Sequence, residues 1–274
     1  MSRMQYGLLG GKLGHSLSPK IHELFFSYTG KKGSYKLLET PEAELPHRLQ
    51  QLRSDGFTGC NVTIPHKVAV MPLLDSIAKE AAAIGAVNTI HFTKQGAFGY
   101  NTDYFGFGRM LEYNGIDAAG KTAVVLGSGG AARAVVSYLK NQQAGELYLA
   151  TRSPEQVDKY FYQIAPRLQV ISYAELEKLT GRILVNCTPV GMYPAVEASP
   201  VNEKISAAFA ASVDLIYNPA QTLFLRQAQA AGHQAVNGLF MLVAQAVAAQ
   251  EIWQRESYGS ELIERIMAEL EKCL

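Results

Sequence analysis

Cysteine is scarce in this chain, and the spacing of its cysteines excludes two kinds of small protein. Only three occur in 274 residues, at Cys60, Cys187 and Cys273. An odd number at such wide spacing fits neither a disulfide framework nor a zinc-ligand pattern. The six histidines include no His-x-x-x-His pair. We therefore expect no metal and a reducing, cytoplasmic compartment.

An excess of charge and a long apolar run are also missing. Lys and Arg number 25 against 24 Asp and Glu, and the longest basic run is Lys31-Lys32. Nucleic acid or an anionic membrane surface would require a basic field. The longest apolar stretch, residues 238–249, is interrupted by Gln245 and is too short to span a bilayer, and residues 1–6 lack the apolar core of a signal peptide. We expect no nucleic-acid partner and no membrane attachment.

The chain does have enough apolar sequence for two hydrophobic cores. Hydrophobic residues make up 48% and charged residues 18%, and 274 residues fit two moderate domains. Short apolar runs alternate with helical patterns, which favours the α/β class with mainly parallel sheets. Residues 88–92 and 97–100 flank Gln95-Gly96, a turn signal that predicts a hairpin.

The other elements follow from the same patterns. Strands are predicted at residues 6–10, 35–38, 57–64, 121–126, 146–150, 168–171, 183–186, 213–216 and 234–236. Helices are predicted at residues 18–28, 42–55, 103–113, 131–140, from 153 onward, and at 221–231, 238–254 and 260–272.

The glycine-rich segment Gly127-Ser128-Gly129-Gly130-Ala131-Ala132 lies between a predicted strand and a predicted helix. Gly127 permits a tight turn, Gly129 allows a pyrophosphate to approach the backbone, and Ala132 is small where helix packs on strand. Many glycine turns bind nothing, but this placement favours dinucleotide binding over a plain turn.

The residues after the next strand indicate which dinucleotide. An NAD site usually has Asp or Glu there to accept from the ribose 2′-hydroxyl, and this chain has Thr151-Arg152-Ser153 instead. A guanidinium can face a 2′-phosphate, so the segment points to NADP. The alternative is a solvated surface arginine.

Lys67 and Asp103 are the candidate reactive groups. Pro65 is suited to starting a helix, so Lys67 would lie in a first turn, where the helix dipole disfavours a cation. A lysine pointing to water is the alternative. Asp103 begins a helix and would by default cap it, whereas beside Lys67 it would form a pair able to hold or move a proton.

Further polar residues occur where the pattern does not require them. Ser18 has a structural role as an N-cap, but Ser16 has none, and two hydroxyls in one loop could bind a small carboxylate. Asn88 follows what reads as the start of a strand at residues 85–87, and Gln245 interrupts an apolar helix. Such amides usually have a partner, in the protein or in a polyhydroxylated ligand.

Taken together, these stretches resemble the shikimate dehydrogenase family over nearly the whole chain. The matching segments are residues 14–19, 61–67, 85–89, 101–103, 127–133, 186–192, 214–219 and 238–245. Each segment is weak evidence alone, and all of them in this order are specific.

The resemblance implies an N-terminal substrate domain of residues 1–103 and 238–274 and a Rossmann-type NADP domain of residues 104–237, which meet at a cleft. It implies reversible reduction of 3-dehydroshikimate to shikimate, in aromatic amino acid biosynthesis, with Lys67 and Asp103 as the catalytic pair. Substrate contacts are implied for Ser16, Ser18, Asn61, Thr63, Asn88, Asp103, Tyr217 and Gln245. Cofactor contacts are implied for Gly127, Ser128, Gly129, Gly130, Ala131, Thr151, Arg152, Ser153, Leu215 and Gly238. The family allows a monomer or a homodimer.

One departure bears on the cofactor. Family members that use NADP often have a second arginine four residues after the first, where this chain has Gln156. A charged contact contributes about 1.5–3 kcal/mol, so we expect NADP selectivity to be reduced rather than reversed.

Three other functions compete with this one. An NAD-preferring quinate/shikimate dehydrogenase is the nearest alternative, because two serines do not exclude an extra hydroxyl beside the carboxylate. A non-catalytic dinucleotide sensor would not need Lys67 and Asp103. A folate-type dehydrogenase would leave Ser16, Ser18 and residues 101–103 unexplained.

Overall fold

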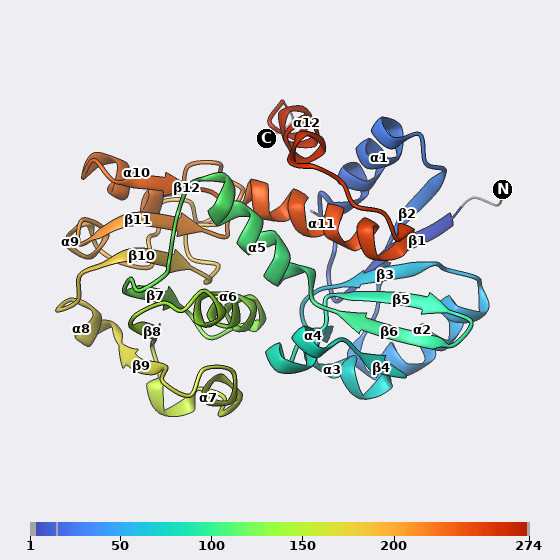
Figure 1. The fold of residues 1–274 in the computed structure, drawn as a ribbon, viewed down its shortest axis with the longest axis horizontal. Helices are drawn as coiled ribbons and strands as arrows, with labels where there is room; N and C mark the ends of the chain where they lie inside the picture. The colour runs from blue at the N-terminus through green and yellow to red at the C-terminus, as the bar shows by residue number, and fades with distance from the viewer. Residues whose placement is uncertain (1–3, 15, 273–274) are drawn as a thin grey trace. The chain divides into compact units, whose positions relative to one another are not determined.

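A computed structural model describes residues 4–14 and 16–272 of the chain. His15 of the first family segment and Cys273 lie outside the described residues. The described residues up to Gly106 and from Val243 onward form unit 1, and Phe107–Leu242 form unit 2 (Figure 1). The chain passes between the units within two helices, α5 (Thr102–Tyr113) and α11 (Leu239–Gln254).

Unit 1 is built on a mixed six-stranded sheet in the order β2-β1-β3-β5-β6-β4. The strands are β1 (Met4–Gly10), β2 (Gly33–Glu39), β3 (Gly59–Val62), β4 (Ser76–Ile77), β5 (Thr89–Thr93) and β6 (Gly96–Tyr100). Strand β1 pairs in parallel with β2 and β3, and β4 with β6, whereas β5 is antiparallel to both β3 and β6. The predicted hairpin is therefore confirmed, and it turns at Gly96, whose φ is 144°.

The helices of unit 1 cover the sheet. They are α1 (Ser18–Thr29), α2 (Leu45–Ser54), α3 (His66–Ala69), α4 (Lys79–Ile84), α12 (Ser260–Leu270) and the parts of α5 and α11 named above, with short 3-10 turns at Glu42–Glu44 and Met71–Leu73. Helix α12 packs against α1. Trp253 of α11 stacks on Tyr6 at 4.7 Å and donates to the carbonyl of Ile90 at 2.9 Å. The C-terminal helices thereby complete the first unit.

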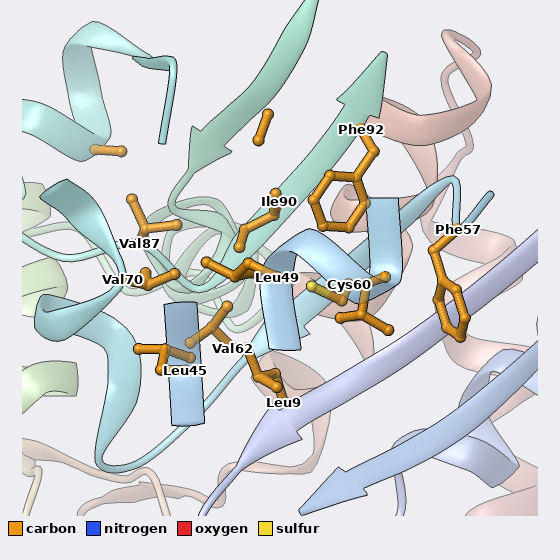
Figure 2. Close-up of a cluster of buried hydrophobic side chains, with 13 residues drawn as sticks. Leu9, Leu45, Leu49, Phe57, Cys60, Val62, Val70, Val87, Ile90 and Phe92 are labelled. Atoms are coloured by element: carbon orange, nitrogen blue, oxygen red, sulfur yellow. The ribbon is translucent and has the colours of Figure 1, made fainter. Parts of the chain in front are cut away.

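One hydrophobic core of unit 1 joins strands β1, β3 and β5 to helix α2 (Figure 2). Leu9, Cys60 and Ile90 of the strands are fully buried, and they meet Leu45 and Leu49 of the helix. This packing fixes the ends of the strands from which the polar residues described below extend.

Unit 2 contains a six-stranded sheet in the order β12-β11-β10-β7-β8-β9, in which every pairing is parallel. The strands are β7 (Ala123–Leu126), β8 (Leu147–Thr151), β9 (Gln169–Ser172), β10 (Gly181–Asn186), β11 (Phe209–Asp214) and β12 (Gln234–Val236). Counted within the unit, this is the 3-2-1-4-5-6 order of the doubly wound Rossmann fold. Such sheets bind ligands at the carboxyl ends of the strands where the order reverses, here between β7 and β10.

The helices of unit 2 are shorter than the sequence predicts in one region. They are α6 (Gly130–Asn141), α7 (Tyr160–Ile164), α8 (Tyr173–Leu176), α9 (Glu203–Ser206) and α10 (Leu223–Ala230). The helix predicted from residue 153 is wrong, because Pro154–Gln156 forms only one 3-10 turn and α7 begins later. Asp158 lies between them, where it pairs with Arg133 and accepts from the backbone of Tyr160.

The interpretation of residues 85–87 as the start of a strand is also wrong. Gly85 ends α4 in the left-handed conformation, with φ of 67°, and β5 begins only at Thr89. Among the described residues, no helix has both the length and the apolar character that crossing a membrane requires.

Candidate active site

Lys67 and Asp103 lie together in unit 1. Lys67 Nζ is 2.5 Å from Asp103 Oδ2, and the two side chains are 16% and 10% exposed. The alternative of a lysine pointing into water is therefore wrong. A charged pair that is mostly shielded but still accessible can exchange a proton with a bound ligand.

Lys67 is positioned by the segment that follows β3. The chain turns through a cis peptide between Ile64 and Pro65, and Lys67 is the second residue of the one-turn helix α3. Its carbonyl accepts from the backbone N–H of Val87 at 2.8 Å, which ties α3 to the segment before β5. Tertiary contacts, rather than helix propensity, therefore hold this single turn.

Asp103 does not cap helix α5, so its default interpretation is wrong. Asn101 is the capping residue: its Oδ1 accepts from the backbone N–H of Tyr104 at 3.2 Å, and its Nδ2 donates to the carbonyl of Ala86 at 2.9 Å. Because Asn101 satisfies the helix start, the Asp103 carboxylate is free to pair with Lys67.

Asn88 holds the other oxygen of Asp103. Its Nδ2 donates to Asp103 Oδ1 at 2.8 Å, and its Oδ1 accepts from the backbone N–H of Thr102 at 2.7 Å. Asn88 is 3% exposed, so this amide is a buried support for the carboxylate. Each oxygen of the Asp103 carboxylate thus accepts a hydrogen bond, one from Lys67 and one from Asn88.

Asn61 belongs to the same buried cluster of polar side chains. It is 5% exposed, its Oδ1 accepts from the hydroxyl of Tyr35 at 2.7 Å, and its Nδ2 donates to Thr89 Oγ1 at 3.0 Å. Sequence reasoning missed both partners. Tyr35 lay in an ordinary strand pattern, and Thr89 appeared only as the last residue of a family segment.

Ser16, rather than Ser18, has the side chain that accepts a backbone hydrogen bond at the start of α1. Ser18 is the first residue of α1 rather than its N-cap, and its side chain makes no capping hydrogen bond. Ser16 Oγ instead accepts from the backbone N–H of Ser18, and the two hydroxyl oxygens lie 3.2 Å apart. The structure thus brings the two hydroxyls together at the start of α1.

The remaining predicted substrate residues are Thr63, Gln245 and Tyr217. Thr63 follows β3 and is half-buried, and its hydroxyl has no hydrogen bond to another described residue. Gln245 is half-buried on α11 of the same unit. Tyr217 belongs to unit 2, where it is half-buried beyond β11, and burial raises the pKa of its phenol.

The glycine turn of unit 2 lies where the strand order reverses, between β7 and β10. Gly127 follows β7 with φ of 89°, and a Cβ added to it would lie 2.6 Å from Thr188 Cγ2. Gly129 precedes α6, no side chain caps that helix, and its first turn contains no acidic residue. A Cβ added to Gly129 would meet nothing within 4 Å. The backbone N–H groups of Gly130 and Ala131 are therefore open to an anion such as a pyrophosphate.

The segment Thr151-Arg152-Ser153 begins at the end of β8, next to the glycine turn. Arg152 is exposed and forms no ion pair with another residue that the structure describes. The segment contains no acidic side chain. The residues therefore fit a dinucleotide whose adenosine ribose carries a phosphate.

Leu215 and Gly238 lie against each other beyond the carboxyl ends of β11 and β12. Gly238 N–H donates to the carbonyl of Ile216 at 2.9 Å, and an added Cβ would lie 2.2 Å from the carbonyl oxygen of Leu215. Only glycine fits this approach of two backbones.

A buried network that the sequence did not reveal supports this region. Asp214 is 0% exposed and accepts from Asn186 Nδ2 at 3.0 Å, from Thr222 Oγ1 at 2.7 Å and from the backbone of Ile216 at 3.0 Å. Burial raises the pKa of the Asp214 carboxyl from 3.8 to about 6, against the opposing effect of its hydrogen bonds. The network joins the ends of β10 and β11.

The Rossmann-type sheet with its glycine turn and the shielded Lys67–Asp103 pair are features of an oxidoreductase that uses a nicotinamide dinucleotide.

Known proteins identify the family. Residues 8–90 match the family model described as the shikimate dehydrogenase substrate binding domain. Shikimate dehydrogenase (NADP(+)) of Clostridium perfringens strain SM101 is 44% identical over 98% of each chain. The crystal structure of a chorismate mutase/shikimate 5-dehydrogenase fusion protein from Clostridium acetobutylicum is 47% identical, with a TM-score of 0.95 over 99% of this chain and 98% of that one.

A third relative was crystallised with ligands. Shikimate 5-dehydrogenase from Thermus thermophilus, in complex with NADP(H) and shikimate, is 34% identical with a TM-score of 0.87 over 97% of this chain and 99% of that one. The chain belongs to the shikimate dehydrogenase family, as the sequence motifs predict.

Proposed function

We propose that this chain is an NADP-dependent oxidoreductase that reversibly reduces 3-dehydroshikimate to shikimate, a step in aromatic amino acid biosynthesis. The observation that carries the proposal is the shielded Lys67–Asp103 pair, supported by Asn88. Its support from relatives is the NADP named for the Clostridium perfringens enzyme and the NADP(H) and shikimate bound to the Thermus thermophilus enzyme.

Unit 1, for which the family implies the range 1–103 with 238–274, is proposed to bind the substrate. Ser16 and Ser18 bind its carboxylate with two neighbouring hydroxyls. Tyr217 is the further substrate contact that the family resemblance implies. The ring hydroxyls are bound by Asn61, Thr63, Asn88, Asp103 and Gln245. The hydroxyl of Thr63, which makes no hydrogen bond to another described residue, supports this assignment, because it is available to a ligand.

Unit 2, for which the family implies the range 104–237, is proposed to bind NADP. The pyrophosphate lies at residues 127–131, the 2′-phosphate at residues 151–153, and the nicotinamide end at Leu215 and Gly238. When bound, NADPH supplies the hydride that adds to the C3 carbonyl of the substrate.

Lys67 and Asp103 are proposed to complete the reaction. Lys67 Nζ donates a proton to the oxygen at C3 as negative charge develops there, and accepts it back in the reverse direction. Asp103 accepts hydrogen bonds from Lys67 and from Asn88, and it thereby orients the ammonium group. It is also proposed to contact a ring hydroxyl of the substrate. Because the two groups are coupled, the transferred proton is assigned to the Lys67–Asp103 pair as a unit.

We also propose that the protein works in the cytoplasm, as a monomer or a homodimer. Cys60 and Cys187 are free thiols, as a reducing compartment favours. Light scattering at micromolar concentration gives the oligomeric state.

Steady-state rates with shikimate and with quinate, each with NADP and with NAD, test the proposal. We expect shikimate with NADP to give the highest kcat/KM of the four combinations. A higher value for quinate with NAD would replace the proposal with the quinate/shikimate alternative. Binding of NADP without turnover of either acid would indicate a dinucleotide sensor.

A further inference from the structure

The polar side chains of unit 1 form one directional chain of hydrogen bonds that ends at Asp103. The Tyr35 hydroxyl donates to Asn61 Oδ1 at 2.7 Å, and Asn61 Nδ2 donates to Thr89 Oγ1 at 3.0 Å. Thr89 Oγ1 donates to Asn88 Oδ1 at 3.0 Å, and Asn88 Nδ2 donates to Asp103 Oδ1 at 2.8 Å. Each donor in this chain points toward the carboxylate.

The orientation of the Asn88 amide determines which of its polar groups faces the Asp103 carboxylate. In the observed direction, an N–H faces the carboxylate, and in the flipped direction a carbonyl oxygen would face it and repel it. Three donors hold the oxygen away from Asp103: the N–H of Thr102 at 2.7 Å, the Thr102 hydroxyl at 3.1 Å and the Thr89 hydroxyl at 3.0 Å.

Thr89 links the side-chain amides of Asn61 and Asn88, and Asn61 Nδ2 also donates to the backbone carbonyl of Asn88 at 3.4 Å. Its hydroxyl accepts from Asn61 and donates to Asn88, and it lies 3.1 Å from the Thr102 hydroxyl. The residue is 0% exposed, so water cannot replace the hydroxyl without a rearrangement. Removing it would leave a buried N–H of Asn61 without its hydroxyl partner and would take away one of the three donors on Asn88 Oδ1.

We propose that Thr89 is a positioning residue for the reaction assigned above. Its hydroxyl, together with Thr102, holds the direction of the Asn88 amide, and through Asn88 it supports the carboxylate that orients Lys67. Thr89 contacts neither substrate nor cofactor, and it acts through the Asn88 amide. The inference rests on the proposed function.

The first test replaces Thr89 with valine, which keeps the shape and removes the hydroxyl. We expect kcat with shikimate and NADP to fall about tenfold, the usual effect of one displaced hydrogen bond, while the KM for NADP is unchanged. Thr93→Val is the matched control. It removes a hydroxyl from the same strand, where Thr93 Oγ1 hydrogen-bonds to the backbone of the turn at Gln95 and Gly96, and its kcat should stay within twofold.

A second pair of variants separates the hydroxyl from packing if the valine variant does not fold. Thr89→Ser and Thr89→Ala both lack the methyl group and differ only in the hydroxyl. We expect the serine variant to keep kcat within about twofold and the alanine variant to lose about tenfold. Equal kcat values for serine and alanine would overturn the proposal.

A double-mutant cycle then tests whether Thr89 acts through Asn88. In an Asn88→Ala background, Thr89→Val should lower kcat by less than twofold, because the amide it orients is gone. A further tenfold loss in that background would show that Thr89 acts by another route, and would overturn the proposal. If the unsubstituted chain does not oxidise shikimate, the proposed function fails and this inference fails with it. If the unsubstituted chain is active and Thr89→Val matches it, only this inference fails.

Discussion

Asp214 gives the sharpest test of the energetics of unit 2. The side chain is fully buried, and its pKa is raised from 3.8 to about 6 because burial disfavours the charged carboxylate. A raised pKa means that the folded state binds the proton more tightly than the unfolded state does. Its stabilising contribution is therefore complete below pH 3.8 and is lost as the pH rises through 6.

The magnitude follows from that shift. About two pKa units correspond to roughly 3 kcal/mol of differential stability, of which about 1.4 kcal/mol is lost between pH 5 and pH 8. Asp214→Asn removes this titration and keeps the shape. The new amide oxygen still accepts from Asn186 and Ile216, and the Thr222 hydroxyl can rotate to accept from the amide nitrogen.

The assay is urea unfolding of both proteins at pH 5, 6, 7 and 8. The difference in free energy of unfolding between the two proteins cancels every other titrating group. We expect that difference to rise in favour of Asp214→Asn by about 1.4 kcal/mol from pH 5 to pH 8. A difference that is independent of pH would refute the view that burial of the charge dominates at this position.

Two further predictions concern the cofactor end. Arg152→Ala should raise the KM for NADP by about ten- to a hundredfold, the effect of one charged hydrogen bond, and should leave the KM for NAD unchanged. The control is Arg167→Ala, which replaces another exposed arginine of unit 2. Equal changes in the KM for both cofactors would contradict the assignment of Arg152. Gly127→Ala places a methyl group 2.6 Å from Thr188 at φ of 89°, whereas Gly120→Ala meets nothing within 4 Å at φ of 65°. Both substitutions carry the left-handed penalty of about 1–2 kcal/mol, so thermal unfolding should show a larger loss at Gly127, and equal losses would contradict the close contact.

The elements with strong local signals could be predicted from the sequence. Gln95-Gly96 between alternating strands gave the hairpin, and the glycine turn gave a strand, a turn and a helix that the structure confirms. Local signals failed where a tertiary contact decides the structure. The pattern predicted a helix from residue 153, but Asp158 pairs with Arg133 and separates the short turn from α7.

The site shows the same division. Lys67 could be singled out because a cation in the first turn of a helix is unusual, whereas Asp103 was a candidate only as a possible partner of Lys67. Nothing in the sequence could show that Asn101 caps the helix and leaves Asp103 to pair with Lys67, because both residues are good capping residues. Thr89 and Tyr35 were missed for a related reason. Their hydroxyls matter through partners on other strands, and both residue types are common in any strand.

The turnover of Lys67→Ala tests the central claim most directly. Shikimate oxidation with NADP is measured beside Lys79→Ala, an exposed lysine of the same unit, and the shikimate affinity of each variant is measured by calorimetry. We expect Lys67→Ala to lower kcat by about a hundredfold or more, the scale of a lost acid–base group, and the control to match the unsubstituted chain. A folded Lys67→Ala variant that binds shikimate and turns it over within severalfold of the normal rate would contradict the assignment of the Lys67–Asp103 pair.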